Sequence, residues 1–243
     1  MNLKLFLLRL KKILLILKNP RLLRVLIKNR VLAGVEHNHI FNNDINTVID
    51  IGANRGQFSL AALNIPNIKI FAFEPLDGPA EVFKEIFKED SNVKLFKFAI
   101  GDTLGEVDMH VSLKDDSSSL LEISPLQNEY FPGTEEIGLK KIKVAPLKNF
   151  LSREEISKPA LLKLDVQGFE LQALRGCENF FEDIDYIYCE CSFMSLYKNQ
   201  SLVTDVVEFL ISKDFKISGV FNMQSDSDGK NIQADFFFVK KYH

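Results

Sequence analysis

The chain has 243 residues, of which 46% are hydrophobic and 26% charged, so it can build a packed core and is not globally disordered. Its net charge is −3, but residues 1–30 hold nine Lys or Arg and no acid, which leaves about −12 for the remaining chain. Nucleic-acid binders present a basic face on the folded domain, so this acidic body predicts no nucleic-acid partner.

The basic N-terminus is predicted to form two short helices. Residues 3–17 place seven large apolar side chains on one charge-free helical face, Asn19-Pro20 ends the run, and residues 21–31 suit a second helix. Charged residues interrupt the apolar ones too often for the ~20 residues that span a bilayer, and no signal-peptide cleavage site follows. Two roles stay open for this segment: contact with anionic lipid, or packing on the protein body or a second subunit.

We therefore divide the chain into a basic segment, residues 1–34, and one domain, residues 35–243. In that domain strands are predicted over residues 47–51, 69–74, 93–100, 106–113, 140–145, 160–165, 184–191, 215–221 and 234–240. Helices are predicted over residues 58–63, 79–88, 169–175 and 202–212, with Gly176 stopping the third. This alternation predicts an α/β, Rossmann-like fold: a mostly parallel sheet with helices on both faces and a C-terminal antiparallel hairpin.

The chain has three cysteines, Cys177, Cys189 and Cys191. An odd number without metal-ligand spacing argues against a disulfide framework and against a zinc site. We expect all three to be buried and reduced, which fits a cytoplasmic protein.

The most informative motif is DIGANRG at residues 50–56, between the first strand and the first helix. Gly52 and Gly56 allow a tight turn and a close approach of the backbone to a ligand beyond the strand ends. Their GxxxG spacing differs from the GxGxxG of dinucleotide-binding proteins and so disfavours NAD. Glu74 ends the next strand, where a carboxylate can accept hydrogen bonds from both ribose hydroxyls of an adenosine. Asp50 either braces the loop or holds the ammonium group of a methionine moiety.

Several longer runs can be compared with known families. They are VIDIGANRGQF at 48–58, FEP at 73–75, AIGD at 99–102, DDSSSL at 115–120, LLKLDVQGFELQALRG at 161–176, YCECSF at 188–193 and QADFFF at 233–238. In these runs the chain resembles the FkbM family of S-adenosylmethionine-dependent methyltransferases. The resemblance implies a class I methyltransferase fold, S-adenosyl-L-methionine as the cofactor, and O-methylation, often of sugar hydroxyls in glycans or of secondary metabolites.

The loop and the matching runs together give the predicted cofactor-binding residues. They are Asp50, Gly52, Asn54, Gly56, Glu74, Ala99, Ile100 and Asp102. The chain departs from the family pattern at Gln167, where many members have Glu. We therefore do not expect Gln167 to act as an acid–base group.

Methylation of an aliphatic hydroxyl requires a positioned acceptor and the removal of one proton. Asp165 is the first candidate base, because a carboxylate that ends an apolar strand is otherwise costly. Glu190 near the end of the next strand is the second candidate and His110 the third. The acid Glu170 opens a helix, where the helix dipole alone favours it. Asp165 and Glu190 could hold a divalent cation, but no spacing requires one, and the prediction includes no metal.

The sequence thus predicts an O-methyltransferase for a glycan or lipid-linked sugar, free in the cytoplasm or at the inner face of the membrane through residues 1–30. The alternatives are a small-molecule O-methyltransferase and a non-catalytic cofactor-binding scaffold. Whether the chain forms a homo-oligomer stays open.

Overall fold

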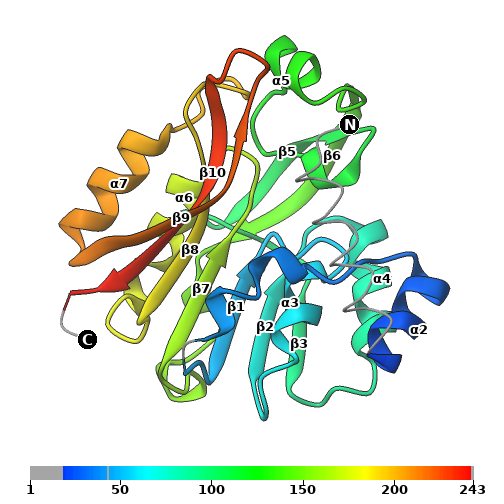
Figure 1. Cartoon of the computed structure of the whole chain (residues 1–243), viewed down its shortest axis with the longest axis vertical. Coiled ribbons are helices and arrows are strands. Elements are labelled where there is room, and N and C mark those ends of the chain that lie inside the picture. Colours follow the sequence, from blue (N-terminus) through cyan, green and yellow to red (C-terminus); the bar gives the residue numbers. More distant parts are fainter. Residues whose placement is uncertain (1–18, 43, 242–243) are drawn as a thin grey trace.

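The computed structural model describes residues 19–42 and 44–241. A seven-stranded sheet forms its centre, in the order β3-β2-β1-β7-β8-β10-β9 (Figure 1). The strands from β3 to β8 in this order are parallel, and β10 is antiparallel to β8 and β9, so the predicted sheet and hairpin are confirmed. Its strands are β1 (Thr47–Ile51), β2 (Lys69–Phe73), β3 (Val93–Phe96), β7 (Ala160–Leu164), β8 (Tyr186–Ser192), β9 (Phe215–Ser225) and β10 (Asn231–Lys240).

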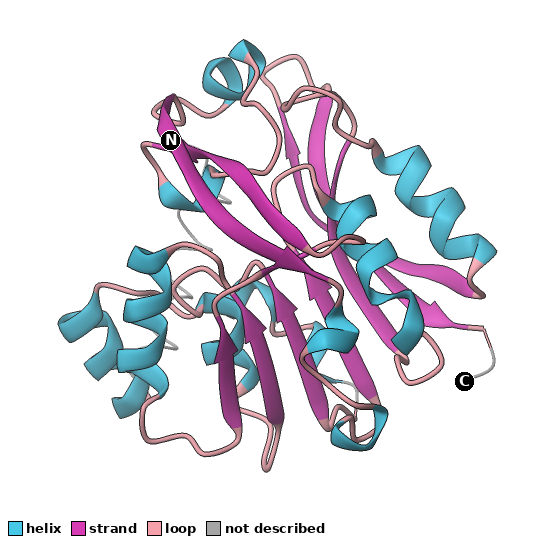
Figure 2. Cartoon of the chain, turned by 180° about the vertical axis from the view of Figure 1, so that it is seen from behind, coloured by secondary structure: helices cyan, strands magenta, loops and turns pink. Residues whose placement is uncertain are grey.

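A second sheet of three strands lies beyond the carboxyl ends of β1 and β2, in the order β4-β6-β5 (Figure 2). It contains β4 (Ala99–Ile100), β5 (Gly105–Ser112) and β6 (Glu136–Ala145). The prediction of one strand over residues 93–100 is therefore wrong, because β3 ends at Phe96 and β4 pairs with β6. The apolar pattern continues through both strands and carries no signal for the change of sheet.

Helices cover both faces of the central sheet (Figures 1 and 2). They are α2 (Pro20–Asn29), α3 (Gln57–Ala62), α4 (Asp77–Phe87), α6 (Glu170–Cys177) and α7 (Val203–Ser212), with α5 (Pro125–Tyr130) outside these layers. Short 3-10 turns are η1 (Val35–His37), η2 (Ile40–Asn42), η3 (Asp115–Ser117), η4 (Leu147–Asn149), η5 (Arg153–Glu155) and η6 (Glu178–Phe180).

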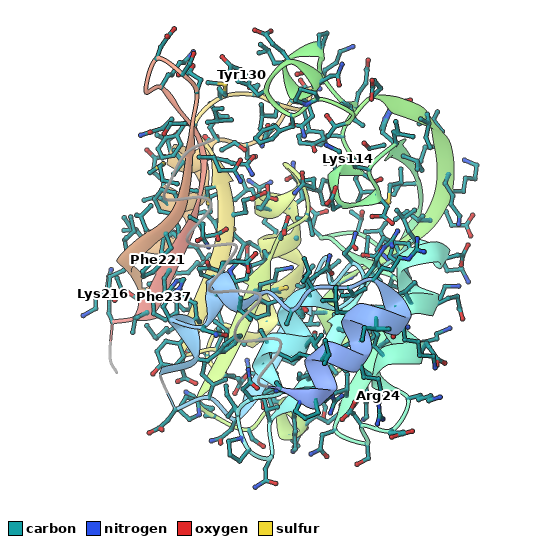
Figure 3. The ribbon with its side chains drawn as sticks, turned by 45° about the vertical axis from the view of Figure 1, so that its right-hand side comes forward. Arg24, Lys114, Tyr130, Lys216, Phe221 and Phe237 are labelled. Atoms are coloured by element: carbon teal, nitrogen blue, oxygen red, sulfur yellow. The ribbon has the colours of Figure 1, made fainter. Side chains whose placement is uncertain are left out.

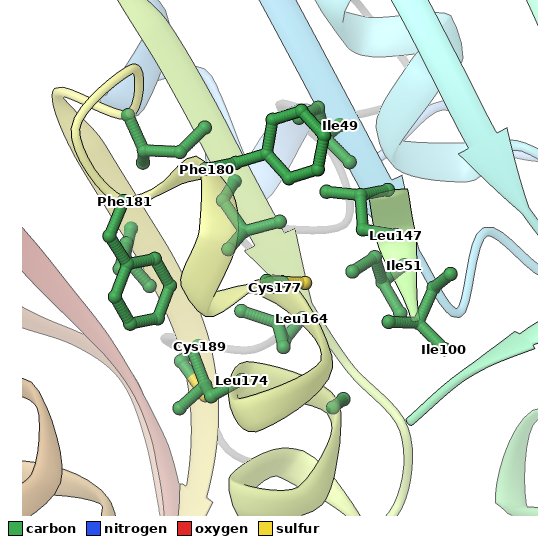
Figure 4. Close-up of a cluster of buried hydrophobic side chains, with 14 of the residues drawn as sticks. Ile49, Ile51, Ile100, Leu147, Leu164, Leu174, Cys177, Phe180, Phe181 and Cys189 are labelled. Atoms are coloured by element: carbon green, nitrogen blue, oxygen red, sulfur yellow. The ribbon is translucent and has the colours of Figure 1, made fainter. Parts of the chain in front are cut away.

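Alternate residues of β1 contribute to the two cores. Ile49 and Ile51 join the apolar cluster of α6 and α7, whereas Val48 joins the cluster of α3. Figure 4 shows the α6 cluster, in which Cys177 and Cys189 lie among large apolar side chains. All three cysteines are buried and form no disulfide, as the sequence predicts.

The predicted second basic helix is confirmed as α2, which lies on α4 (Figure 1). Its apolar face is buried there, and ion pairs join Arg21 to Asp90 and Lys28 to Glu85. Arg24 lies on its exposed side (Figure 3). This part of the basic segment thus pairs with the acidic body.

The predicted helix over residues 3–17 lies outside the described residues. Membrane contact through residues 1–30, the cytoplasmic location and a homo-oligomer therefore stay predictions. No helix within residues 19–42 and 44–241 is long and apolar enough to cross a membrane.

The prediction that Gly176 stops its helix is wrong, because α6 continues to Cys177. A Cβ at position 176 would collide with the backbone of Gly101, so the glycine lets α6 approach the loop after β4. A glycine in a sequence can mark a helix end or such a close approach, and the pattern alone does not separate the two.

We expect Gly176→Ala to lower the free energy of unfolding by about 1–3 kcal/mol, the usual cost of overpacking. Gly78→Ala is the matched control, because Gly78 also lies in a helix and a Cβ there meets nothing within 4 Å. That variant should be neutral or more stable by up to about 1 kcal/mol. Urea unfolding measures both, and equal stabilities of the two variants would contradict a packing constraint at position 176.

Candidate active site

Two adjoining cavities lie at the carboxyl ends of the parallel strands, where α/β folds bind their ligands. The first, of about 260 Å³, lies between the loop after β1, the end of β2 and the three-stranded sheet. The second, of about 680 Å³, lies between the ends of β7 and β8, the β9–β10 hairpin and the segment after β5. The residues that line both cavities are Glu36, His37, Asp116, Asp165 and Gln167.

The loop after β1 forms one wall of the first cavity. Its backbone is left-handed at Gly52 and Asn54, with φ of 75° and 46°. A Cβ at position 52 would collide with the carbonyl group of Asp165, so this glycine lets the ends of β1 and β7 approach each other. The sequence predicts that Gly52 lets the backbone approach a ligand; in the structure this glycine lets the backbone approach Asp165 after the neighbouring strand.

Glu74 is the buried acid of the first cavity. Its carboxylate accepts the backbone N–H of Asn54 at 2.9 Å and that of Leu76 at 2.8 Å. Burial raises the pKa of Glu74 to about 7, although both N–H groups act in the opposite direction. Because two carboxylate oxygens accept about four hydrogen bonds, Glu74 can still bind hydroxyl groups of a ligand.

Asp50 and Lys163 lie opposite each other on β1 and β7. The Nζ of Lys163 is 3.1 Å from Oδ1 of Asp50 and donates to the Gly52 carbonyl at 2.8 Å. Ser59 of α3 donates to the other Asp50 oxygen at 2.7 Å. Burial lowers the pKa of Lys163, but the carboxylates of Asp50, Asp165 and Glu190 together outweigh burial and the net pKa is raised, so the amine stays charged. Asp50 is fully buried and lines neither cavity, and its contacts with Lys163 and Ser59 brace the start of the loop.

Some of the other predicted cofactor residues line the first cavity, and others do not. Ala99 and Ile100 line the first cavity together with Gly52, Asn54 and Glu74.

Asp102 is exposed and lines neither cavity. Gly56 is the N-cap of α3 with φ of 91°, and a Cβ there would meet two Phe rings of α4. Gly56 is not among the lining residues and allows the close packing of α3 on α4.

Gln167 connects the two predicted carboxylates. Its Nε2 donates to Asp165 at 2.7 Å and to Glu190 at 3.1 Å, and its Oε1 accepts the hydroxyl of Tyr197 at 2.8 Å. The amide N–H groups thus separate two acids that would otherwise repel each other. Among the residues the structure describes, no group of three or more His, Cys, Asp or Glu could hold a metal ion.

The second cavity is polar and acidic. Its carboxylates are Glu36, Asp116, Asp165, Glu190 and Asp235, and its amides are Gln127, Gln167, Asn222, Gln224 and Gln233. Among the described residues, Lys114 of the segment after β5 is the one Lys or Arg that lines this cavity, and Figure 3 shows it across from the β9–β10 hairpin that carries Phe221. Burial, with the nearby Asp165 and Asp235, raises the pKa of Glu190, which also accepts Gln233 Nε2 at 2.7 Å.

The remaining acid–base candidates lie outside both cavities. His110 Nδ1 is 2.7 Å from Glu136 Oε2 on the β5–β6 sheet. The buried Glu170 accepts two backbone N–H groups of its own loop at 3.1 Å each. Of the predicted bases, the structure therefore brings Asp165 and Glu190 to the cavities.

Sequence reasoning missed Lys163, His37 and the connecting role of Gln167. Lys163 had a signal, since it is a lone charge inside the apolar strand ALLKL, as Asp50 is in TVIDI. Two opposite lone charges in neighbouring buried strands imply a pair. His37 lies in a short turn with no periodicity to interpret.

Comparison with known proteins gives one family. Residues 50–217 match the model of the methyltransferase FkbM domain. The 2-O-methyltransferase NoeI of Sinorhizobium fredii is 27% identical over 177 residues, which are 68% of this chain and 71% of that protein.

Two solved structures are similar at lower identity. Magnesium protoporphyrin IX methyltransferase from Synechocystis, with bound S-adenosylmethionine, gives a TM-score of 0.47 at 10% identity over 85% of this chain and 76% of its own. Precorrin-6y C5,15-methyltransferase from Geobacter metallireducens gives 0.45 at 14% identity over 85% and 87%.

We expect Lys163→Met to lower the free energy of unfolding by about 3–5 kcal/mol, because the buried Asp50 carboxyl group loses its cationic partner. The double variant Asp50→Asn with Lys163→Met should be more stable than Lys163→Met alone, since no unpaired charge remains. Lys148→Met, at an exposed lysine, is the control and should change stability by less than about 0.5 kcal/mol. Denaturant unfolding decides; equal losses for the two lysines would show that the pair does not support the fold.

Proposed function

We propose that this chain, which belongs to the FkbM family of S-adenosylmethionine-dependent methyltransferases, methylates a hydroxyl group of a sugar. The observation that carries the proposal is the second cavity, whose lining of carboxylate and amide side chains matches a polyhydroxylated acceptor. The relative NoeI is named a 2-O-methyltransferase, which supports oxygen as the acceptor atom.

S-adenosylmethionine is the cofactor, and the first cavity has groups that fit it. The buried Glu74 would accept hydrogen bonds from the ribose, and Leu76, Phe98, Met109 and Leu120 give an apolar slot for the adenine ring. When bound, the cofactor supplies a methyl group on a sulfonium sulfur, with a neutral thioether as the leaving group. The chain's own residues must then position the acceptor and accept its proton.

The second cavity can hold such an acceptor. Its volume of about 680 Å³ is within the ~300–1,000 Å³ typical of small-molecule sites. Sugar hydroxyls both donate and accept hydrogen bonds, so they can bind the carboxylate of Glu190 and the amide of Gln233. Asp165 lines both cavities, and its side chain is 43% exposed, so it would hold the hydroxyl that faces the first cavity.

The charge of this cavity adds a restriction on the acceptor. Within the part of the chain that the structure describes, five carboxylate residues and one lysine line the cavity. An acceptor with phosphate or carboxylate groups would be repelled there, whereas a neutral or amino sugar would not. We therefore propose a neutral or cationic glycan as the acceptor.

For the cofactor, we expect Glu74→Ala to weaken binding of S-adenosylhomocysteine by about 1.5–3 kcal/mol, the usual worth of hydrogen bonds to a charged group. Asp102→Ala is the matched control, because this acid is exposed and lies outside both cavities. Calorimetry measures both, with circular dichroism to check folding. Comparable losses in the two variants would show that Glu74 does not bind the cofactor directly.

For the acceptor, we expect purified protein to transfer radiolabelled methyl groups to neutral or amino oligosaccharides at least about 10-fold faster than to uronic-acid or phosphorylated ones, which corresponds to about 1.4 kcal/mol of discrimination. The Glu74→Ala variant serves as the blank with impaired cofactor binding. Labelled products are then located by mass spectrometry. Methylation at nitrogen or carbon, or a preference for anionic glycans, would rule out the proposed acceptor.

A further inference from the structure

His37 lies at the junction of the two cavities, in η1, and lines both of them. Its ring is 5.3 Å from the Phe58 ring and 5.4 Å from the Tyr188 ring, measured between centroids. Gly34 leaves the space that the ring needs, since a Cβ there would lie 2.9 Å from His37 Cδ2. The imidazole is thus held in place, and 21% of its side chain remains exposed.

A hydrogen-bond chain ends on this imidazole. The hydroxyl of Tyr188 is 2.7 Å from Oδ2 of Asp235, and His37 Nδ1 is 3.0 Å from the same hydroxyl. Asn222 Nδ2 donates to both Tyr188 and Asp235, at 3.2 and 2.7 Å.

The protons in this chain can be assigned by counting donors. A carboxylate only accepts, so the single proton of Tyr188 points to Asp235. The Tyr188 oxygen then accepts from its remaining neighbours, and Nδ1 of His37 must be an N–H donor to it. A neutral imidazole with its proton on Nδ1 has a lone pair on Nε2. This Nε2 has no hydrogen-bond partner among the described residues, and it belongs to a ring that faces both cavities.

We propose that His37 is the catalytic base, which removes the proton of the acceptor hydroxyl through Nε2, and that Tyr188 and Asp235 are positioning residues that fix its tautomer. The proposal rests on the proposed O-methylation. The sequence analysis names Asp165 as the first candidate for the base that removes this proton. Because the Asp165 carboxylate accepts a hydrogen bond from Gln167 and lies 4.0 Å from the Lys163 ammonium, we assign it the orientation of the hydroxyl instead.

The surroundings of His37 keep it neutral. Burial lowers its pKa, and this effect outweighs the carboxylates of Asp235, Glu36 and Asp165, which raise it; Lys163 lowers it further. Glu36 belongs to η1, Lys163 to β7, Asp165 to the loop after β7, and Asp235 to β10. Tyr188 contributes an uncharged hydroxyl from β8. A base with a pKa below the ordinary ~6.5 of histidine is unprotonated at neutral pH.

The proposed step balances atoms and charge. The acceptor O–H bond breaks and its proton goes to Nε2. An electron pair of the acceptor oxygen forms the bond to the methyl carbon. The carbon–sulfur bond breaks with its pair on sulfur. The positive charge of the sulfonium thus ends on the imidazolium of His37, which returns the proton to water.

One test needs no acceptor. Nitrogen-15 NMR of histidine-labelled full-length protein, with and without S-adenosylhomocysteine, reports the tautomer, and the signal lost in His37→Gln identifies the residue. We expect the Nδ1–H tautomer for His37 and a shift toward Nε2–H in Tyr188→Phe, because Nδ1 loses its acceptor. An Nε2–H tautomer in the parent protein would overturn the proposal whether or not the proposed function holds.

The second test uses neutral methyl glycosides and the pH profile of kcat/KM. We expect activity to rise with pH to a plateau, with the midpoint below about 6.5, as the imidazole loses its proton. His37→Gln should lower kcat at least about 100-fold and abolish this rise, whereas His110→Gln should leave both unchanged. Asp165→Asn should raise KM and keep the rise. Activity retained in His37→Gln, or a rise lost in Asp165→Asn, would overturn the proposal; if no glycoside reacts, the tautomer decides it.

Discussion

The site depends on the buried ammonium of Lys163. It binds the Asp50 carboxylate in the neighbouring strand, holds the carbonyl of Gly52 at the start of the loop, and lies 4.0 Å from Asp165 at the end of its own strand. One cation thus joins the floor of the first cavity to the carboxylate that faces the second. A buried pair is stabilised by further hydrogen bonds, and here Ser59 donates to Asp50 and the Gly52 carbonyl accepts from Lys163.

The second cavity solves a different problem, which is to keep several carboxylates close together. The amides of Gln167 and Gln233 donate to Asp165 and Glu190, so hydrogen bonds take the place of counter-charges. The cavity therefore keeps a negative potential while its acids stay ordered. Such a lining suits hydroxyl groups, which both donate and accept, better than it suits an anion.

Much of this arrangement could be predicted from the sequence. The alternation of strands and helices predicts a parallel sheet, and α/β folds bind their ligands at the carboxyl ends of such strands, where the last residues of β1, β2 and β7 lie. Glu74 and Asp165 lie at the cavities for that reason. Asp102 and His110 do not, because the sequence gives their positions along the chain but not the faces they present. The partners of His37 are harder to predict. His37 lies in a short turn without periodicity, and its partner Tyr188 is 151 residues away in the sequence.

The close contact between α6 and the loop after β4 has a consequence for the shape of the first cavity. Gly101 follows the two β4 residues in the cavity wall, and Phe169, another wall residue, directly precedes α6. Because a Cβ at Gly176 would collide with the backbone of Gly101, α6 packs directly on the loop after β4 and the two walls are held against each other. The five described residues that line both cavities, Glu36, His37, Asp116, Asp165 and Gln167, all lie outside β4, the loop after it and α6, so a change at the Gly101–Gly176 contact would reshape the first cavity away from its junction with the second.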